Sequence, residues 1–334
     1  MMNGGCGIRM RRTDMGEGLT RREMAAGSVA AGVSWLWKGR CAAAEFKTQL
    51  LRAQIVGKPS EKNLEPLKAG GFDGVETQAA DVSPDEAAAC KAVADRIGLK
   101  IHSVMRAWMS FNGKPEEVEA TIAKTETSLR AAQAYGADAI LLVPCRIGVK
   151  PPEPWDLRIE FDPKTLHLTR VVEGDNAAYA DYIRAHDHAT DASIRAVERL
   201  IPTAEKTGVV IAIENVWNNL WIMPELFAAF VGSFKSKWVQ AYFDIGNHVK
   251  FAPPERYLKA LGPLVRKCHV KDFKLNENGR GGNWAKVREG SVNWPVVRRT
   301  LEEIGYSGWL TLEADAGPTP ADQVRTLDLI IRGE

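Results

Sequence analysis

The run Val209-Val-Ile-Ala-Ile-Glu-Asn215 sets the architecture of this chain: it is short, apolar, rich in β-branched residues, and ends abruptly on a carboxylate. This pattern predicts a buried strand whose last side chain is functional. Three further runs have the same form, at 239–244, 264–269 and 309–313. Because the C-terminal ends of parallel strands meet at one mouth of a barrel, we expect Glu214, Asp244, His269 and Glu313 to lie together.

The rest of the chain supplies the remaining strands and helices of such a barrel. Four more predicted strands lie at 47–56, 72–76, 99–104 and 137–143. The predicted helices lie between the strands, at 60–70, 85–97, 115–135, 176–206, 223–230, 253–261, 294–304 and 320–331. Eight alternating pairs predict a single (β/α)8 TIM barrel over residues 45–334. An open doubly wound sheet is the alternative, but no GxGxxG follows a strand and no GxxxxGK[ST] is present to cradle a nucleotide.

Residues 146–175 interrupt this alternation. They carry Pro151, Pro152, Pro154 and Pro163 and show no sustained periodicity. Segments of this length in compact domains are usually lids or binding loops. Because the segment follows the fourth strand, we expect it above the mouth of the barrel.

Composition excludes some classes of function. The chain has 44 Lys plus Arg and 42 Asp plus Glu, and the first 44 residues hold seven of the bases and three of the acids. The remaining 37 basic and 39 acidic residues leave no positive excess, which argues against nucleic acid as a partner. The five cysteines form no CxxC pair and no zinc-finger spacing, so they are expected to be buried thiols rather than a disulfide framework.

Residues 1–44 have the pattern of a targeting segment. Thr20-Arg-Arg-Glu-Met24 precedes an apolar run, 25–37, that is too short for a membrane anchor, and Ala42-Ala-Ala44 offers a small-residue cleavage site. This resembles a twin-arginine export signal, with Arg21 and Arg22 as the pair. The resemblance implies a bacterial periplasmic protein with no stable membrane span after cleavage. An ordinary basic amphipathic extension is the alternative.

From about Leu50 to the C-terminus, the chain resembles the sugar isomerase and epimerase family of xylose isomerase-like barrels. Five pieces in one order are more specific than any single one. The matching pieces are Ile213-Glu-Asn215, Phe243-Asp-Ile-Gly-Asn247, Cys268-His-Val-Lys-Asp272, Arg288-Glu-Gly-Ser-Val-Asn-Trp294 and Gly305-Tyr-Ser-Gly-Trp-Leu-Thr-Leu-Glu313.

The resemblance implies roles for particular residues. The four strand-end residues Glu214, Asp244, His269 and Glu313 would bind one divalent metal, manganese first, with magnesium, cobalt or zinc as alternatives. Other residues would line the same mouth and contact substrate: Glu76, His102, Lys271 and Glu289. Several family epimerases have a histidine where this chain has Asn247, so that substrate contact differs here.

Three carboxylates and one imidazole form a mostly hard oxygen site that suits manganese or magnesium and tolerates zinc. A metal there would stabilise negative charge on a carbonyl oxygen while a neighbouring C–H proton leaves. Glu214 and Glu313 would then abstract and return the proton, which isomerises or epimerises a sugar through an enediolate. If a β-substituent departs instead, the same site acts as a lyase or hydratase on a keto-glycoside.

Other interpretations stay open from the sequence. A single glutamate that ends a buried strand is more often a salt-bridged barrel residue than a ligand, but four such endings favour a metal site. A non-catalytic sugar-binding barrel and an apurinic endonuclease share the predicted fold. The endonuclease normally needs several metals and more than the six histidines present here. We therefore expect a small-molecule sugar or keto-sugar as partner, and the sequence leaves a homo-oligomer open.

Overall fold

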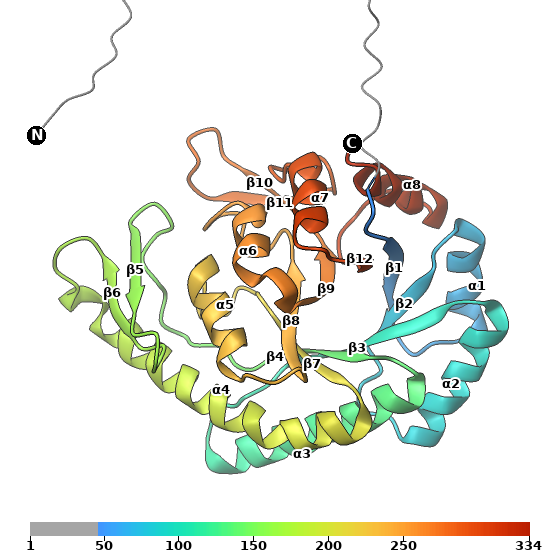
Figure 1. Cartoon of the computed structure of the whole chain (residues 1–334), viewed down its shortest axis with the longest axis horizontal. Helices are drawn as coiled ribbons and strands as arrows, with labels where there is room; N and C mark the ends of the chain where they lie inside the picture. The colour runs from blue at the N-terminus through green and yellow to red at the C-terminus, as the bar shows by residue number, and fades with distance from the viewer. Residues whose placement is uncertain (1–45) are drawn as a thin grey trace, which may run out of the picture. The chain divides into compact units, whose positions relative to one another are not determined.

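The protein was analysed as a computed structural model that describes residues 46–334, so the predicted signal segment lies outside the described residues. Eight parallel strands close into a barrel in the order β1-β12-β9-β8-β7-β4-β3-β2 (Figure 1). These strands are β1 (Leu50–Val56), β2 (Gly74–Thr77), β3 (Lys100–Trp108), β4 (Ala139–Val143), β7 (Val210–Glu214), β8 (Val239–Asp244), β9 (Val265–Val270) and β12 (Gly308–Leu312). The predicted (β/α)8 TIM barrel is confirmed.

Helices follow the barrel strands and cover the outside of the barrel. They are α1 (Glu61–Gly70), α2 (Pro84–Ile97), α3 (Pro115–Tyr135), α4 (Ala180–Thr207), α5 (Pro224–Ser233), α6 (Pro254–Leu261), α7 (Trp294–Glu303) and α8 (Pro320–Ile331), with short 3-10 turns η1 (Ala177–Tyr179) and η2 (Gly262–Leu264). Local sequence explains the helix ends. Ser83 caps α2 by accepting a hydrogen bond from the Glu86 amide at 3.2 Å, and Gly98 ends the helix in the left-handed conformation that glycine adopts without a steric penalty.

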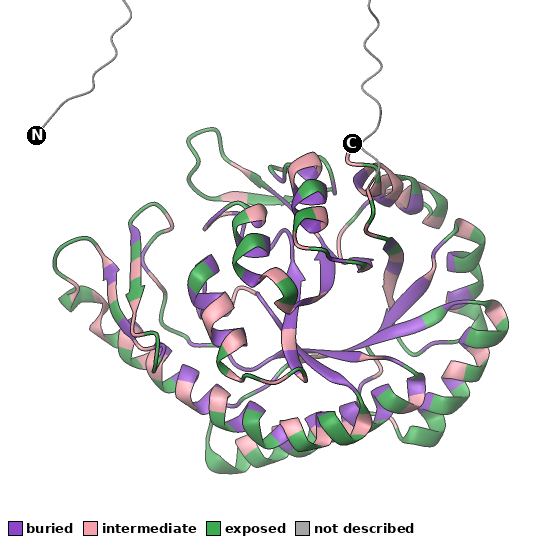
Figure 2. Ribbon diagram, in the orientation of Figure 1, coloured by how far each residue is buried: buried purple, intermediate pink, exposed green. Residues whose placement is uncertain are grey.

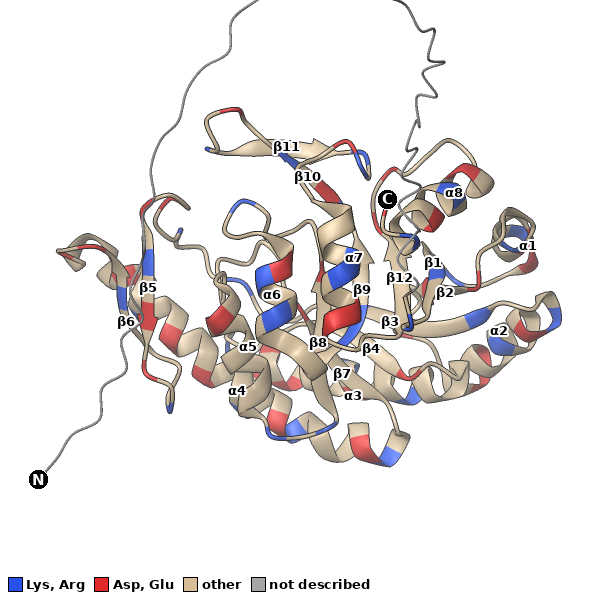
Figure 3. Cartoon of the chain, turned by 45° about the horizontal axis from the view of Figure 1, so that its top comes forward, with Lys and Arg blue, Asp and Glu red and all other residues tan. Residues whose placement is uncertain are grey.

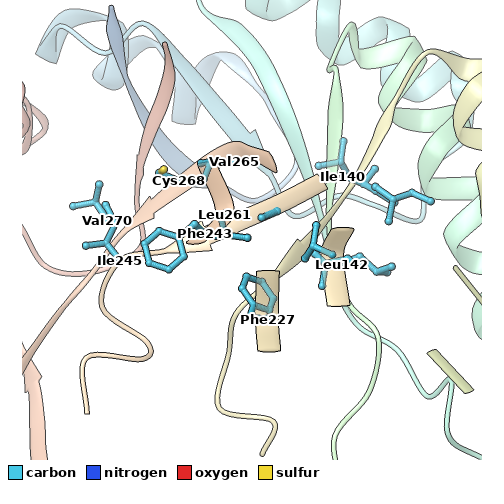
Figure 4. Close-up of a cluster of buried hydrophobic side chains, with 14 of the residues drawn as sticks. Ile140, Leu142, Phe227, Phe243, Ile245, Leu261, Val265, Cys268 and Val270 are labelled. Atoms are coloured by element: carbon cyan, nitrogen blue, oxygen red, sulfur yellow. The ribbon is translucent and has the colours of Figure 1, made fainter. Parts of the chain in front are cut away.

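The hydrophobic core lies between the barrel strands and the helices. Phe243 and Cys268 of the barrel belong to one buried cluster with Phe227 of α5 and Leu261 of α6 (Figure 4). Figure 2 shows the strands buried and the outer faces of the helices exposed. Because side chains alternate along a strand, the neighbours of the outward-facing residues point into the barrel. Tyr242, next to Phe243, belongs to a second buried cluster on the inner wall of the barrel.

Two segments predicted as irregular contain small antiparallel sheets. Within residues 146–175, β5 (Leu157–Phe161) pairs with β6 (Leu168–Val172). After β9, β10 (Asp272–Leu275) pairs with β11 (Gly282–Ala285) across the glycine-rich turn. Each of these strands has only four or five residues, and most are partly exposed, so they carry too little hydrophobic alternation for the sequence to reveal them.

The outer surface carries charges of both signs. Lys and Arg lie among Asp and Glu on α6 and α7 (Figure 3), and ion pairs such as Arg256–Glu225, with 2.8 Å between nitrogen and oxygen, bridge neighbouring helices. The three cysteines of the described region, Cys90, Cys145 and Cys268, are free and buried, as predicted. No helix among residues 46–334 combines the length and the apolar character needed to cross a membrane.

Candidate metal centre

The four predicted strand-end residues converge at the mouth of the barrel. Glu214, Asp244, His269 and Glu313 each offer one ligand atom, and these atoms all lie within 4.8 Å of one another. His269 Nδ1 lies 3.3 Å from Glu214 Oε1 and 2.7 Å from Glu313 Oε2. The side chains come from β7, β8, β9 and the end of β12, so the closure of the barrel, and not their spacing in the chain, brings them together.

Glu76 of β2 orients the imidazole from the opposite side. Its Oε2 lies 2.6 Å from His269 Nε2, and its Oε1 accepts a hydrogen bond from Ser103 Oγ at 2.7 Å. All three side chains are fully buried. Nε2 donates its proton to Glu76, and a cation at Nδ1 would take the place of the proton that faces Glu214 and Glu313. This carboxylate–histidine arrangement is how metal-ligating histidines are usually held.

Asp244 is positioned by backbone contacts at the end of β8. Its Oδ1 accepts hydrogen bonds from the amides of Gly246 at 2.9 Å and Asn247 at 2.6 Å. Asn215 bonds to both the amide and the carbonyl of Asp244, at 2.7 and 2.8 Å, and so ties the ends of β7 and β8 together. A side chain at Gly246 would meet the Lys271 backbone at 2.7 Å, so this turn needs glycine. The motif around Asp244 therefore builds the turn that presents its carboxylate.

Lys271 and Asn247, which were expected to contact substrate, border the cluster. Lys271 Nζ lies 2.9 Å from Glu313 Oε1, and Asn247 Nδ2 lies 3.5 Å from Glu214 Oε1. Lys271 and Glu313 line a cavity of about 540 Å³ together with Trp284. The buried cluster thus has an open side with an ammonium group and an aromatic ring at its edge.

Burial and mutual repulsion shift the acidities in the cluster. Burial raises the pKa of Glu214, and the neighbouring carboxylates of Glu313 and Asp244 add to that shift. Burial also raises the pKa of Asp244, against the opposing effect of Lys271. Burial opposes a charge on His269, but Glu76 and Glu313 outweigh it and raise the pKa of the imidazole. His269 and Lys271 outweigh burial at Glu313 and lower its pKa to about 2. Four carboxylates thus surround these two cationic groups.

These features fit a divalent cation. Asp244 Oδ2 is buried and accepts no hydrogen bond from any described residue, and Lys271 Nζ lies 3.6 Å from it. A buried carboxylate oxygen without a partner is costly unless a cation occupies the space beside it. Three carboxylates and an imidazole that would give up its Nδ1 proton to the metal are a donor set that divalent metals accept. The cluster can hold a metal ion.

His102 and Glu289 are not brought to the cluster. A register shift between β2 and β3 pairs Glu76 with Ser103, so His102 lies deeper in the barrel. There it stacks on Trp309, with 4.3 Å between ring centroids, and it is fully buried. This position does not fit the expected contact with substrate. Glu289 is exposed on the turn after β11, with no hydrogen bond or ion pair from its side chain to another described residue.

Sequence reasoning missed the role of Asp272. Its carboxylate accepts hydrogen bonds from the amide of Arg288 at 2.9 Å and from Trp294 Nε1 at 3.0 Å. A side chain at Gly290 would lie 1.9 Å from Asp272 Oδ1, so the 288–294 motif wraps closely around this carboxylate. The only sequence signal was the joint presence of Asp272 and that motif. This turn anchors the β10–β11 hairpin above the mouth.

Aromatic residues on two loops form one wall of the mouth. Trp284 of β11 stacks on Trp217, which follows β7, with 4.9 Å between ring centroids. Phe273 packs edge-on against both rings. Trp217 Nε1 also donates a hydrogen bond to the Asn247 carbonyl. The hairpin and the loop after β7 therefore meet as one packed unit beside the cluster.

Comparisons with known proteins bear on the fold and the family. Among curated proteins, an uncharacterized protein of Methanocaldococcus jannaschii is 30% identical over 129 residues, which cover 37% of this chain and 43% of that protein. The chain therefore matches less than half the length of this relative.

Solved structures share the fold at low sequence identity. A 3-keto-D-glucoside 4-epimerase of E. coli superposes with a TM-score of 0.61 at 15% identity, covering 84% of this chain and 99% of that chain. The IolI protein with a bound zinc atom has a TM-score of 0.61 at 15% identity, covering 84% and 98%. A mannonate dehydratase of Streptococcus suis has a TM-score of 0.60 at 17% identity, covering 85% and 94%. The family model described as "Xylose isomerase-like TIM barrel" matches residues 64–330, and the chain belongs to this family.

Proposed function

We propose that this protein is a divalent-metal-dependent sugar isomerase or epimerase that moves a proton beside a carbonyl through an enediolate. The observation that carries the proposal is the convergence of Glu214, Asp244, His269 and Glu313 within 4.8 Å at the mouth of the barrel. The family membership and the epimerase among the solved structures support the sugar chemistry.

A bound cation would be held by these four side chains and would supply Lewis-acid stabilisation of negative charge on a carbonyl oxygen. We assign manganese first, because the donor set is rich in carboxylate oxygen and has a single imidazole nitrogen; magnesium, cobalt and zinc are the alternatives. Glu76 would fix the tautomer of His269 by accepting the Nε2 proton. Asn215 and Gly246 would hold Asp244 in place.

Glu214 and Glu313 would carry the proton in this proposal. Each has a carboxylate oxygen near the same atom, His269 Nδ1, so the two groups flank one point at the mouth. One removes the proton from the carbon beside the carbonyl, and the other returns a proton. Return to the opposite face of the same carbon gives the epimer, and return to the former carbonyl carbon gives the isomer. Lys271 would hold a substrate oxygen because it lines the cavity, and Asn247 would assist because its side chain lies beside Glu214 and Lys271.

The test is proton exchange with solvent. The purified protein is stripped with a chelator, reloaded with Mn²⁺, and incubated in heavy water with a panel of ketoses and keto-sugars. The proposal expects deuterium next to the carbonyl with the loaded protein and none with the stripped protein. If no sugar of the panel exchanges with the loaded protein, the proposed function is wrong.

Elimination is the second candidate, because Lys271 places an ammonium group in the same cavity as Glu313 and can protonate a departing substituent. The first step is shared, since both reactions remove a proton beside a carbonyl. Release of an aglycone from a keto-glycoside would favour a lyase. Retention of every substituent during exchange would favour the isomerase.

We also propose that the protein is exported to the periplasm, as the pair Arg21 and Arg22 before an apolar run indicates. Replacing both arginines with lysine should keep the full-length precursor in the cytoplasm. Export of that variant at the wild-type level would contradict this route.

A further inference from the structure

We propose that the pocket beneath the proline-rich segment, formed by Pro151, Pro152, Trp155, Lys250 and Phe251, is a subsite for the second ring of a glycoside. The inference rests on the proposed function and names its substrate class. The sugar that reacts would occupy the metal centre, and its substituent, an aromatic aglycone or a second sugar, would occupy this pocket. The protein would therefore act on keto-glycosides, whose oxidised ring supplies the carbonyl, rather than on free monosaccharides.

The pocket has the chemistry of a ring-binding site. It encloses about 290 Å³, and its lining combines three prolines, Trp155 and Phe251 with the polar residues Lys150, Glu153, Asn219 and Lys250. Trp155 is 38% exposed, which is high for a tryptophan outside a binding surface. Ligand sites are typically apolar concavities with a few placed polar groups, and tryptophan faces bind sugar and aryl rings well.

Lys250 supplies the polar group. Its Nζ lies 3.6 Å from the centre of the Trp217 ring and 4.9 Å from that of Phe251. Within residues 46–334, no carboxylate makes an ion pair with it at 4.0 Å or less. Burial lowers the pKa of this ammonium, against the opposing effect of Glu153. A half-buried donor of this kind is available to a hydroxyl or ether oxygen of a ligand.

The pocket is preformed. Asn219 Nδ2 donates to the carbonyls of Ile147 and Val149, at 3.2 and 3.3 Å, and so ties the start of the proline-rich segment to the loop after β7. On the other side, Arg280 stacks over Trp155 with 4.9 Å to the ring centroid. The prolines and these contacts already restrict the loop, so the loop loses less conformational entropy when a ligand binds.

A chain of side-chain contacts connects the pocket to the cavity at the metal centre. Trp217 contacts Lys250 on one side and Trp284 on the other, and Trp284 lines the cavity that contains Lys271 and Glu313. The β10–β11 hairpin also reaches both cavities, because Gly281 lines the second and Trp284 the first. A free monosaccharide would occupy only the first cavity, whereas a two-ring substrate uses both.

Paired glycosides test this inference. Methyl and phenyl β-glycosides of glucose, galactose, mannose and allose are titrated calorimetrically into the Mn²⁺-loaded full chain. For at least one sugar, the phenyl member should bind about tenfold or more tightly than the methyl member, since it adds one stacked ring. Trp155→Ala and Lys250→Met should reduce that ratio severalfold while the affinity for the methyl glycoside stays within twofold.

Trp108→Ala is the matched control. Trp108 is 41% exposed and also stacks on an arginine, Arg146, but it does not line this pocket. This variant should keep the wild-type ratio. Equal affinities within every pair, no binding of any phenyl glycoside, or an equal loss for both members in Trp155→Ala would overturn the subsite.

The subsite and the proposed function can fail separately. A phenyl preference that depends on Trp155, without deuterium exchange in any sugar, would support the subsite and contradict the proposed isomerase function. Deuterium exchange that is equal in wild type and Trp155→Ala, without a phenyl preference, would support the isomerase function and contradict the subsite.

Discussion

Lys267 and Lys271 point into the same barrel from β9 and its end, yet their surroundings shift them in opposite directions. Lys267 is 2% exposed and pairs with Asp138, with 2.6 Å between nitrogen and oxygen. Burial lowers its pKa to about 8 despite that partner. Lys271 is 16% exposed and lies between Asp244 and Glu313. Burial again opposes the charge, but the two carboxylates outweigh it and raise the pKa of Lys271.

The difference lies in the balance of charge at the two ends of the barrel. At the N-terminal end, Lys267 and Arg266 share the single carboxylate of Asp138. At the C-terminal end, four carboxylates surround Lys271 and His269. In the first cluster the cations outnumber the carboxylate, and burial of Lys267 is met by lowering its pKa. The second has an excess of anionic oxygen that its own residues do not neutralise, which is the condition for binding a cation.

Glu214→Gln should have the largest effect, because it removes a proposed ligand and a proposed proton carrier together. We expect solvent exchange to fall about 10³-fold, within the range of a lost general base. Calorimetric titration should show Mn²⁺ affinity falling in parallel, whereas Asp138→Asn, at the other end of the barrel, should keep wild-type affinity. Unchanged Mn²⁺ affinity in Glu214→Gln would remove this residue from the metal centre.

The pH dependence of stability should report the N-terminal end. The folded pKa of Lys267, about 8, lies below the ordinary lysine value of 10.5, so the unfolded chain binds more protons between these two pH values. Stability contributed by this group should therefore rise between pH 8 and 10.5, by about 3 kcal/mol at 1.36 kcal/mol per pKa unit. Urea unfolding of wild type and Lys267→Met at both pH values measures it. The same pH slope in both proteins would contradict the assignment.

Glu76→Gln should weaken metal binding although Glu76 is not itself one of the proposed ligands. The neutral amide cannot hold the imidazole proton as the carboxylate does, so Mn²⁺ affinity should fall about 10- to 100-fold. Circular dichroism should show an intact fold. Ser103→Ala, which removes only the hydrogen bond to Glu76, should have a smaller effect on affinity; an effect larger than that of Glu76→Gln would argue against the positioning role.

Asp138→Asn should have the smallest of these effects. It leaves Lys267 without its carboxylate, but Asp138 is 40% exposed and water screens the pair. We expect a loss of about 1–2 kcal/mol in the free energy of unfolding, with urea denaturation as the measurement. Metal affinity and solvent exchange should stay at the wild-type level. A large loss of metal affinity would mean that the two ends of the barrel are coupled.

The strand-end residues could be predicted because each is marked by the apolar run that directly precedes it. Glu214, Asp244 and His269 each end an apolar run, and Glu313 comes directly after one; the barrel topology requires those ends to share one mouth. Lys271 and Asn247 were predicted from neighbouring motif positions and lie beside the cluster. The apolar run before each strand end was enough to assign the direction of the four strand-end residues, whereas Lys271 and Asn247 were expected from the resemblance to the family.

His102 shows where that rule fails. A histidine on the third strand was expected to face the mouth, but the register shift opposite Glu76 moves Ser103 into that level. A register shift of one residue changes which side chain of β3 lies opposite Glu76, and the local sequence gives no sign of it. The hairpins β5–β6 and β10–β11 were missed for a related reason, since they are stabilised by packing on the loops around them and not by their own periodicity.

The amino-acid sequence by itself determined the alternation of strands and helices, the closed barrel, and the identity of the four side chains at its mouth, because hydrophobic period and strand-end chemistry are properties of neighbouring residues. Tertiary structure alone decided that Glu76 orients His269 and that Trp155, Trp217 and Trp284 border adjoining cavities. It also decided that the pKa of Lys267 is lowered and that of Lys271 is raised. Burial and the number of nearby charges depend on segments far apart in the chain, so they exist only once the barrel has closed.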